Sequence, residues 1–326
     1  MKITKWVGAS VITIAVAHAA GAVTLPGPLV TAQWLKDHQN EVTVVDVRDD
    51  MKSYTTEPRF NVDKATGKKS LVETGGHITD SISVDFGKIR EERTVDGVKI
   101  KAQLPTAEHF QKVMDDFGLN KTDKPLVIVS PGDSILTMDM ATRLYFQLRY
   151  FGEPRDKMAI LNGGVNAWIQ EGYPVSTDQA SAKNGDWATH GEDKEILASM
   201  KQVKEGLRKG SDEFIDARPT DQFLSIVKAP VDKTAGHLAG AHSFPTDAIV
   251  KPVGAAREFM SAAEYKKIYA QLHINPKARN VSYCNTGHLA SGTWFVSSEI
   301  MGNKHARLYA GSMTEWTNLN NPTVGQ

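Results

Sequence analysis

The only cysteine of the 326-residue chain, Cys284, lies in the stretch NVSYCNTGHLASGTWFV, residues 280–296. The letters VSY before it indicate the end of a buried strand, and apolar residues at helical spacing follow it. The sequence therefore predicts a strand-to-helix connection at the carboxyl edge of a parallel sheet, where open α/β folds bind ligands. Backbone N–H groups of residues 285–290 would surround the sulfur there, lower its pKa and favour a nucleophilic thiolate. The alternative is a cysteine that serves only as a small buried apolar residue.

The elements that must position this cysteine occur in two successive sets. The first set is VTVVDVR (42–48), GGHITDSISVDF (75–86), PLVIVSPG (125–132) and MAILNGGVNAWIQEGYPV (158–175). The second set is EFIDARP (213–219), AGHLAGAHSFP (235–245), NVSYCNTG (280–287) and ARLYAGSMTEWTNLNNP (306–322). Because four signals recur in the same order, the chain is predicted to contain a duplicated domain.

Each set has the pattern of an α/β domain. Short apolar runs bounded by turn residues, such as Thr43–Val47 and Leu126–Val129, predict buried parallel strands, as do Phe214–Ile215 and Val281–Tyr283. Helices are predicted over 106–119 and 261–274, where apolar residues at helical spacing follow a Thr or Ser cap. We expect two mostly parallel sheets, each covered by helices on both faces.

The length of the chain also favours two domains of about 150 residues each. We place them at 23–178 and 194–326. The polar segment between them, 179–193, lacks periodicity and is predicted to be a linker.

The first 22 residues have the features of a secretory signal peptide: two lysines, an uncharged and mostly apolar run over 6–17, and small residues before a cleavage site. Cleavage is predicted after Ala22, with Ala19 as the alternative. An uncleaved membrane anchor is disfavoured because the run is shorter than the ~20 residues that span a bilayer. Cleavage would remove two lysines and no acidic residue, leaving a net charge of −2. That balance indicates neither nucleic acid nor an anionic membrane surface as a partner. The signal peptide alone predicts an exported, periplasmic protein.

The ordered motifs resemble those of the tandem-domain rhodaneses, which are sulfurtransferases. The markers are DVR and DAR after the first strand of each half, GHI and GHL after the first loop, the cysteine loop, and LNGGVNAW and YAGSMTEW near the end of each half. The resemblance covers roughly residues 30–322 and implies two rhodanese-like domains. It also implies that Cys284 in the second domain is catalytic. The first domain has Ser130 and Pro131 in the corresponding loop, so it is predicted to be inactive and to act as a wall of the cleft or as a docking surface for a partner.

The resemblance implies a ping-pong reaction without a cofactor. The Cys284 thiolate takes a sulfane sulfur from thiosulfate or 3-mercaptopyruvate, becomes a persulfide, and passes the sulfur to cyanide or a thiol. A periplasmic redox or sulfur-carrier protein is a further possible partner. The loop residues that would shape the donor site are Asn285, Thr286, Gly287, His288 and Leu289. Protonated His288 would attract an anionic donor more strongly at pH 6 than at pH 8.

Two departures from the family pattern leave the donor open. The loop contains no Lys or Arg, whereas relatives that use thiosulfate carry basic residues there. Relatives that use mercaptopyruvate have an arginine shortly after DAR, but Gln222 occupies the expected position here. Arg218 remains as a candidate substrate-binding residue, and the alternative is a structural ion pair with Asp216.

Other features have simpler interpretations. His77 and His237 occur in both halves, so an architectural role is favoured, and Trp168 and Trp316 are predicted core residues. No metal site is indicated, because the pair His190 and His242 lacks ligand spacing to any cysteine or carboxylate cluster.

Two other classes of function are alternatives to a sulfurtransferase. A cysteine phosphatase is disfavoured because its Cys-x5-Arg loop would place arginine near Ala290. A non-catalytic carrier that receives sulfur from a protein partner is the second alternative.

Overall fold

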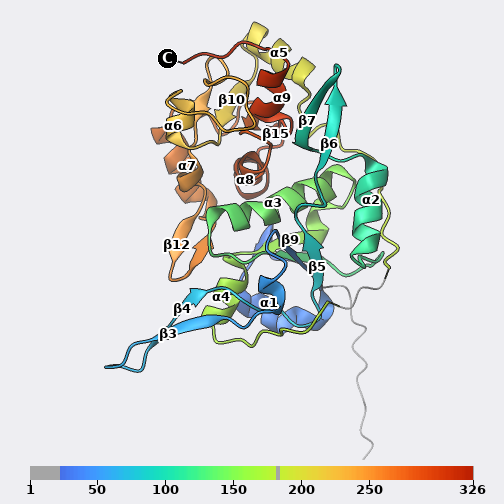
Figure 1. Cartoon of the computed structure of the whole chain (residues 1–326), viewed down its shortest axis with the longest axis vertical. Coiled ribbons are helices and arrows are strands. Elements are labelled where there is room, and N and C mark those ends of the chain that lie inside the picture. Colours follow the sequence, from blue (N-terminus) through green and yellow to red (C-terminus); the bar gives the residue numbers. More distant parts are fainter. Residues whose placement is uncertain (1–22, 181–183, 326) are drawn as a thin grey trace, which may run out of the picture.

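The computed structural model describes residues 23–180 and 184–325, so the predicted signal peptide lies outside the described residues. Within this part of the chain no helix is long and apolar enough to cross a membrane. The first half contains a parallel sheet in the order β1-β9-β8-β2-β5 (Figure 1). Its strands are β1 (Leu29–Val30), β2 (Thr43–Arg48), β5 (Ile82–Asp85), β8 (Leu126–Val129) and β9 (Met158–Leu161).

The second half contains a shorter parallel sheet in the order β11-β10-β14-β15. Its strands are β10 (Glu213–Asp216), β11 (His242–Ser243), β14 (Asn280–Tyr283) and β15 (Arg307–Leu308). The two parallel α/β sheets confirm the predicted fold class. The two sheets pair equivalent strands. In the first half β2 pairs with β8, which precedes Ser130, and in the second half β10 pairs with β14, which precedes Cys284.

Helices cover both faces of the sheets. In the first half they are α1 (Ala32–His38), α2 (Ala107–Asp116), α3 (Ile135–Tyr150) and α4 (Gly164–Gln170). In the second half they are α5 (Met200–Lys209), α6 (Thr220–Phe223), α7 (Ala262–Gln271), α8 (Leu289–Phe295) and α9 (Ser312–Asn318). The predicted helices over 106–119 and 261–274 correspond to α2 and α7, whose caps Thr106 and Ser261 accept backbone hydrogen bonds from His109 and Glu264.

Three antiparallel hairpins, which the sequence analysis did not predict, extend from the described domains. They are β3 (Arg59–Val62) with β4 (Lys69–Glu73), β6 (Glu91–Val95) with β7 (Val98–Gln103), and β12 (Lys251–Val253) with β13 (Ala256–Glu258). The β6–β7 hairpin belongs to the first half but contacts α9 of the second, whereas β13 of the second half contacts α4 of the first (Figure 1). The halves therefore exchange hairpins.

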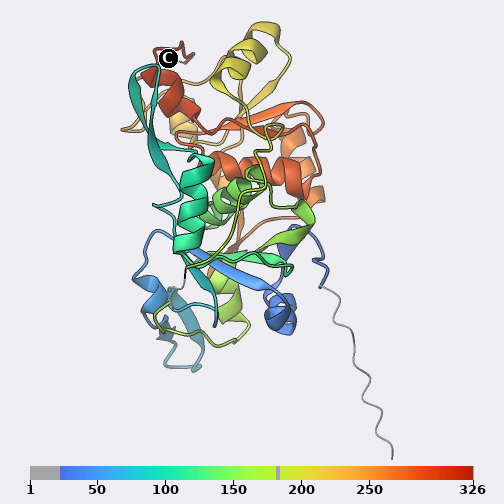
Figure 2. The same cartoon turned by 90° about the vertical axis from the view of Figure 1, so that its right-hand side faces the viewer.

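One of the three buried apolar clusters among the described residues contains residues of both halves. Helices α3 and α8 pack against each other in the middle of the molecule, as both views show (Figures 1 and 2). Tyr145 and Phe146 of α3 meet Trp294 and Phe295 of α8 with ring centroids 4.9–6.4 Å apart. Because these rings are buried, a large apolar area would be exposed if the halves separated.

The described part of the predicted linker packs on the first half. Trp187 is buried, and its Nε1 donates to Glu153 at 2.6 Å. The backbone N–H groups of His190 and Asp193 donate to Phe151 and Tyr150. A polar, aperiodic sequence predicts a loop, but it does not show that one tryptophan anchors that loop.

Candidate active site

Cys284 follows β14 directly and precedes the first turn of α8, at the carboxyl edge of the second sheet. Its side chain is only 1% exposed, and the Gly287 N–H donates to its sulfur at 3.1 Å. Gly287 has φ +75°, and a Cβ there would lie 2.6 Å from the Ala310 carbonyl oxygen and from Arg143 Nη1. Only glycine therefore lets the backbone turn this closely around the sulfur.

Burial and the backbone have opposite effects on this sulfur. Burial raises the pKa of the Cys284 thiol above its usual value, and the nearby Asp216 charge adds to the rise. The N–H groups of Ala290, Thr286 and Gly287 oppose it by stabilising the thiolate. The expectation of a lowered pKa is thus wrong for the free thiol, because burial outweighs the cradle of N–H groups.

Ser312 fixes the backbone of Cys284 through a hydrogen bond to its N–H. Its hydroxyl accepts from the Cys284 N–H at 3.1 Å and donates to the Tyr309 carbonyl at 2.8 Å. Ser312 has φ +53°, a region that glycine occupies easily, and the matching position of the first half is Gly164 with φ +59°. The sequence analysis missed Ser312, although this departure from the repeat was a detectable signal.

The neighbouring loop residues are placed as follows. Asn285 donates through its side chain to Gln222 Oε1 at 2.9 Å, so the glutamine found where relatives carry an arginine does reach the loop. Thr286 and Leu289 are partly buried, and Leu289 begins α8.

His288 contacts the first half of the chain. Its Nε2 lies 3.1 Å from the Leu136 carbonyl oxygen, and its ring lies 4.6 Å from that of Phe86. Burial, followed by the charges of Arg90 and Arg143, lowers the pKa of His288 to about 3. The expected imidazolium is therefore absent at pH 6, and the ring can contribute only shape and a hydrogen bond.

Arg218 forms the ion pair that the sequence analysis left as an alternative. It is completely buried, donates to both Asp216 carboxylate oxygens at 2.6–3.1 Å, and donates to the Gly236 carbonyl at 2.8 Å. Arg48 makes the same contacts with Asp46 and Gly76 in the half without a cysteine. A contact present in both halves favours an architectural role over substrate binding.

Two cations near the loop come from the first half and were missed by sequence reasoning. Arg143 of α3 is completely buried and donates from Nη1 to the Gly287 carbonyl at 2.9 Å. Arg90 is partly buried, with its guanidinium 4.2 Å from the Phe86 ring centre. The cysteine loop contains no cation of its own, so the domain interface supplies the positive charge.

Ser130 occupies the position in the first half that Cys284 occupies in the second. Its carbonyl accepts from Val165 at 2.8 Å, as the Cys284 carbonyl accepts from Met313 at 3.0 Å. The next carbonyls, of Pro131 and Asn285, accept in the same way. The Ser130 hydroxyl is buried and lies 3.8 Å from a methionine sulfur.

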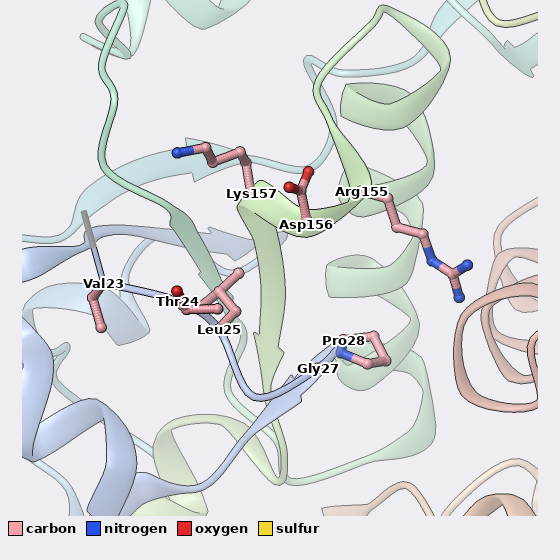
Figure 3. A pocket seen from close by; sticks show the side chains of 8 residues that line it. All are labelled: Val23, Thr24, Leu25, Gly27, Pro28, Arg155, Asp156 and Lys157. Atoms are coloured by element: carbon pink, nitrogen blue, oxygen red, sulfur yellow. The ribbon is translucent and has the colours of Figure 1, made fainter. Parts of the chain in front are cut away.

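A pocket of about 560 Å³ lies away from the cysteine loop, between the segment 23–28 and residues 155–157 (Figure 3). In it Arg155 and Lys157 point away from each other, so they do not converge on one ligand position. Among the described residues no three His, Cys, Asp or Glu side chains are grouped as metal ligands would be.

Comparison with known proteins gives a consistent result. The model of the rhodanese-like domain matches twice, over residues 31–171 and 199–319. A Haloferax volcanii protein provisionally named a thiosulfate sulfurtransferase is 27% identical over 89% of this chain and 93% of its own. The sulfur carrier protein TtuD of Thermus thermophilus is 26% identical over 90% of this chain and 95% of its own.

The fold also resembles that of a solved structure. The anaerobic ergothioneine biosynthesis enzyme from Chlorobium limicola has a TM-score of 0.71 and 20% identity. The match covers 92% of this chain and 70% of that enzyme.

Proposed function

The chain belongs to the rhodanese family of sulfurtransferases, and from this premise we propose that it moves a sulfane sulfur from thiosulfate or 3-mercaptopyruvate to a thiophilic acceptor through a persulfide on Cys284. The observation that carries the proposal is the Gly287 N–H at 3.1 Å from the sulfur, inside a cradle that also includes the N–H groups of Thr286 and Ala290. Fixed donors of this kind stabilise negative charge without reorganising during the reaction.

The proposed reaction with thiosulfate has two steps, and both take place at the sulfur of Cys284. The Cys284 thiolate attacks the outer sulfur of thiosulfate, a new S–S bond forms, and sulfite leaves with the electron pair of the broken bond. The persulfide then bears its charge on the outer sulfur, within reach of the N–H groups. Cyanide attacks that sulfur, thiocyanate leaves, and the thiolate is restored. With 3-mercaptopyruvate as donor, the leaving group is the enolate of pyruvate, which takes up a proton.

The decisive experiment is the intact mass of the protein after incubation with each donor in separate tubes. Because the chain has one cysteine, a gain of one sulfur atom that is absent in Cys284→Ala assigns the persulfide to Cys284. We expect at least one donor to give this gain. Wild type that gains no sulfur from either donor, or Cys284→Ala that still transfers sulfur, would contradict the proposal.

A sulfur carrier is the second candidate function. Two observations favour it: the cysteine loop has no Lys or Arg to bind a small dianion, and the relative from Thermus thermophilus is named a sulfur carrier. A carrier would receive sulfur from a protein and would not turn over a small donor. Steady production of thiocyanate from thiosulfate and cyanide excludes this candidate, whereas loading by a protein persulfide alone supports it.

We also propose that the protein works in the periplasm and exchanges sulfur with a thiol or a redox or carrier protein there. The support is the signal-peptide pattern of residues 1–22. Cell fractionation with an antibody to the mature chain tests this, and recovery only in the cytoplasm contradicts it.

A further inference from the structure

Arg143 connects the inactive half of the chain to the active-site loop. It lies on α3, is completely buried, and donates from Nη1 to the carbonyl oxygen of Gly287 at 2.9 Å. The N–H of the same glycine donates to the Cys284 sulfur at 3.1 Å. One residue of the loop thus joins the guanidinium to the sulfur, and the position of Gly287 depends on both.

The remaining donors of Arg143 are not used by the described protein. No protein group accepts from its Nε or Nη2, although both atoms are buried. Removing a guanidinium from water costs free energy that one carbonyl contact does not repay. An anion that forms beside the guanidinium during the reaction would supply the missing interaction.

Among the charged groups around the cysteine loop, Arg143 is the buried cation that contacts the loop. His288 is neutral at working pH, as described above. Asp216 forms an ion pair with Arg218, and the Arg90 guanidinium lies over the Phe86 ring. Asp139, one turn earlier on α3, makes no ion pair with any residue that the structure describes, and burial raises its pKa well above the usual range.

Arg143 itself stays charged at neutral pH. Burial and repulsion from Arg90 lower its pKa to about 10, and the Cys284 sulfur opposes that change. The pKa of Cys284 is governed mainly by burial and by backbone N–H groups, and the Asp216 charge contributes further. Arg143 is linked to Cys284 by the two hydrogen bonds of Gly287, one at its carbonyl and one at its N–H.

We propose that Arg143 is a positioning residue of the Cys284 site. Its guanidinium holds the loop at the Gly287 carbonyl and supplies the positive charge that favours the anionic sulfur. It takes the place of the cations that the loop lacks. The proposal rests on the proposed function in one respect, namely that Cys284 is the reactive group. It gives the half without a cysteine a direct part in the chemistry.

The test is the pH dependence of alkylation of the thiol by iodoacetamide. Because Cys284 is the only cysteine, the rate reports this site alone. Arg143→Lys keeps the charge without the planar fork, whereas Arg143→Gln keeps a donor for the Gly287 carbonyl without the charge. Arg155→Gln is the matched control, since Arg155 also crosses between the halves but binds Glu299, at 2.6 Å.

We expect Arg143→Gln to raise the alkylation midpoint by about one pH unit or more, a roughly tenfold loss of thiolate near neutral pH. Arg143→Lys and Arg155→Gln should stay near the wild-type midpoint. Equal midpoints in the wild type and folded Arg143→Gln overturn the proposal, as does an equal rise in Arg155→Gln, which would show a general loosening of the interface. If Arg143→Gln does not fold, Arg143→Met provides the neutral side chain without a buried donor.

Alkylation needs no sulfur donor. A failure of the sulfurtransferase proposal would appear in the donor mass experiment and leave these midpoints unchanged. A failure of the Arg143 proposal would leave persulfide formation by the wild type intact. The two results are therefore separable.

Discussion

At the scale of single residues, the sulfur of Cys284 is held by groups from separate parts of the chain. Gly287 comes from the cysteine loop, Ser312 from the start of α9, and Arg143 from α3 of the other half. A sequence pattern can locate the nucleophile, since it follows a predicted strand. It cannot locate partners that only the tertiary fold brings together.

Ser312 offers a test of backbone positioning. Ser312→Ala removes the acceptor of the Cys284 N–H and keeps a side chain at φ +53°, so we expect a loss of about 1–3 kcal/mol in the free energy of unfolding. Ser312→Gly removes the same acceptor but relieves the strained φ, by about 1 kcal/mol. Urea unfolding should place the glycine variant above the alanine variant. The reverse order would show that strain at Ser312 is negligible.

His288 offers a test of charge. Because burial lowers its pKa to about 3, the ring is neutral at both pH 6 and pH 8. His288→Ala should therefore raise the KM for an anionic donor by the same factor at the two pH values, and His288→Gln should retain part of the binding through its amide donor. Steady-state kinetics at both pH values is the measurement. A clearly larger effect at pH 6 would show that His288 is protonated at that pH, as the sequence analysis expected.

At the scale of elements, α3 and α8 form the contact on which the site depends. The α8 helix ends in a π-helical turn, Val296–Ile300, and within it Glu299 accepts from Tyr145 at 3.1 Å and from Arg155 at 2.6 Å. Ser291 and Thr142 share a hydrogen bond of 2.8 Å in the same interface. The interface is thus polar as well as aromatic, and side chains of α3 reach the cysteine loop across it.

Asp139 of α3 is expected to make the stability of this interface depend on pH. Neither of its carboxylate oxygens has a partner among the described residues, and burial raises its pKa well above the usual range. The folded protein therefore keeps a proton that the unfolded chain releases above about pH 4, so the stabilisation from this proton falls as pH rises. Urea unfolding at pH 4.5 and pH 7 should show Asp139→Asn gaining stability relative to wild type at the higher pH. A difference independent of pH would show that Asp139 is ionised in the fold.

The sequence predicted the central elements well and the hairpins poorly. Parallel strands such as β2 and β8 are buried on both faces and appear as short apolar runs, which a pattern detects. In the β6–β7 hairpin only Ile100 and Gln103 are buried, and β7 (VKIKAQ) alternates between apolar and polar residues whereas β6 (EERTV) does not. Its turn residues, Asp96 and Gly97, have positive φ, and the DG pair between Val95 and Val98 is a hairpin signal that could have been used.

At the scale of the whole molecule, the two halves are built as one unit. Asn162 and Asn166 of the first half bond to the backbone of Phe259 and Ala255 in the second. Gly132 lies two residues after Ser130, the equivalent of Cys284, and its carbonyl accepts from the Arg257 N–H of β13 at 2.8 Å. Each half thus braces the loop of the other, by Arg257 in one direction and Arg143 in the other.

This arrangement predicts a single unfolding transition. Separating the halves would expose the aromatic residues between α3 and α8 and leave buried polar groups such as Glu299 without partners. Scanning calorimetry of the mature chain should therefore give one peak, with equal calorimetric and van't Hoff enthalpies. Two separate peaks would mean that the interface contributes little to stability.

The sequence revealed the duplication but not how the copies fit together. The repeated histidines illustrate the difference: His77 and His237 each bond through Nδ1 to a carbonyl, at 2.9 and 2.8 Å, and stack on Tyr54 and Phe223. Such contacts lie within one copy, so repetition in the sequence is enough to identify them as architectural. Contacts between the copies, such as that of Arg143 with Gly287, join residues of different repeats, so a comparison of one repeat with the other does not reveal them.

The exchange of hairpins also bears on the ancestry of the chain. Two copies that contact each other reciprocally have the geometry of a twofold-symmetric dimer whose subunits have become one polypeptide. Such a dimer would have carried two equivalent sites, each braced by the neighbouring subunit. After fusion, one site could lose its thiol, as at Ser130, while its framework was kept by the contacts that the other site still requires. Selection on catalysis at Cys284 would then preserve residues in a half that performs no chemistry of its own.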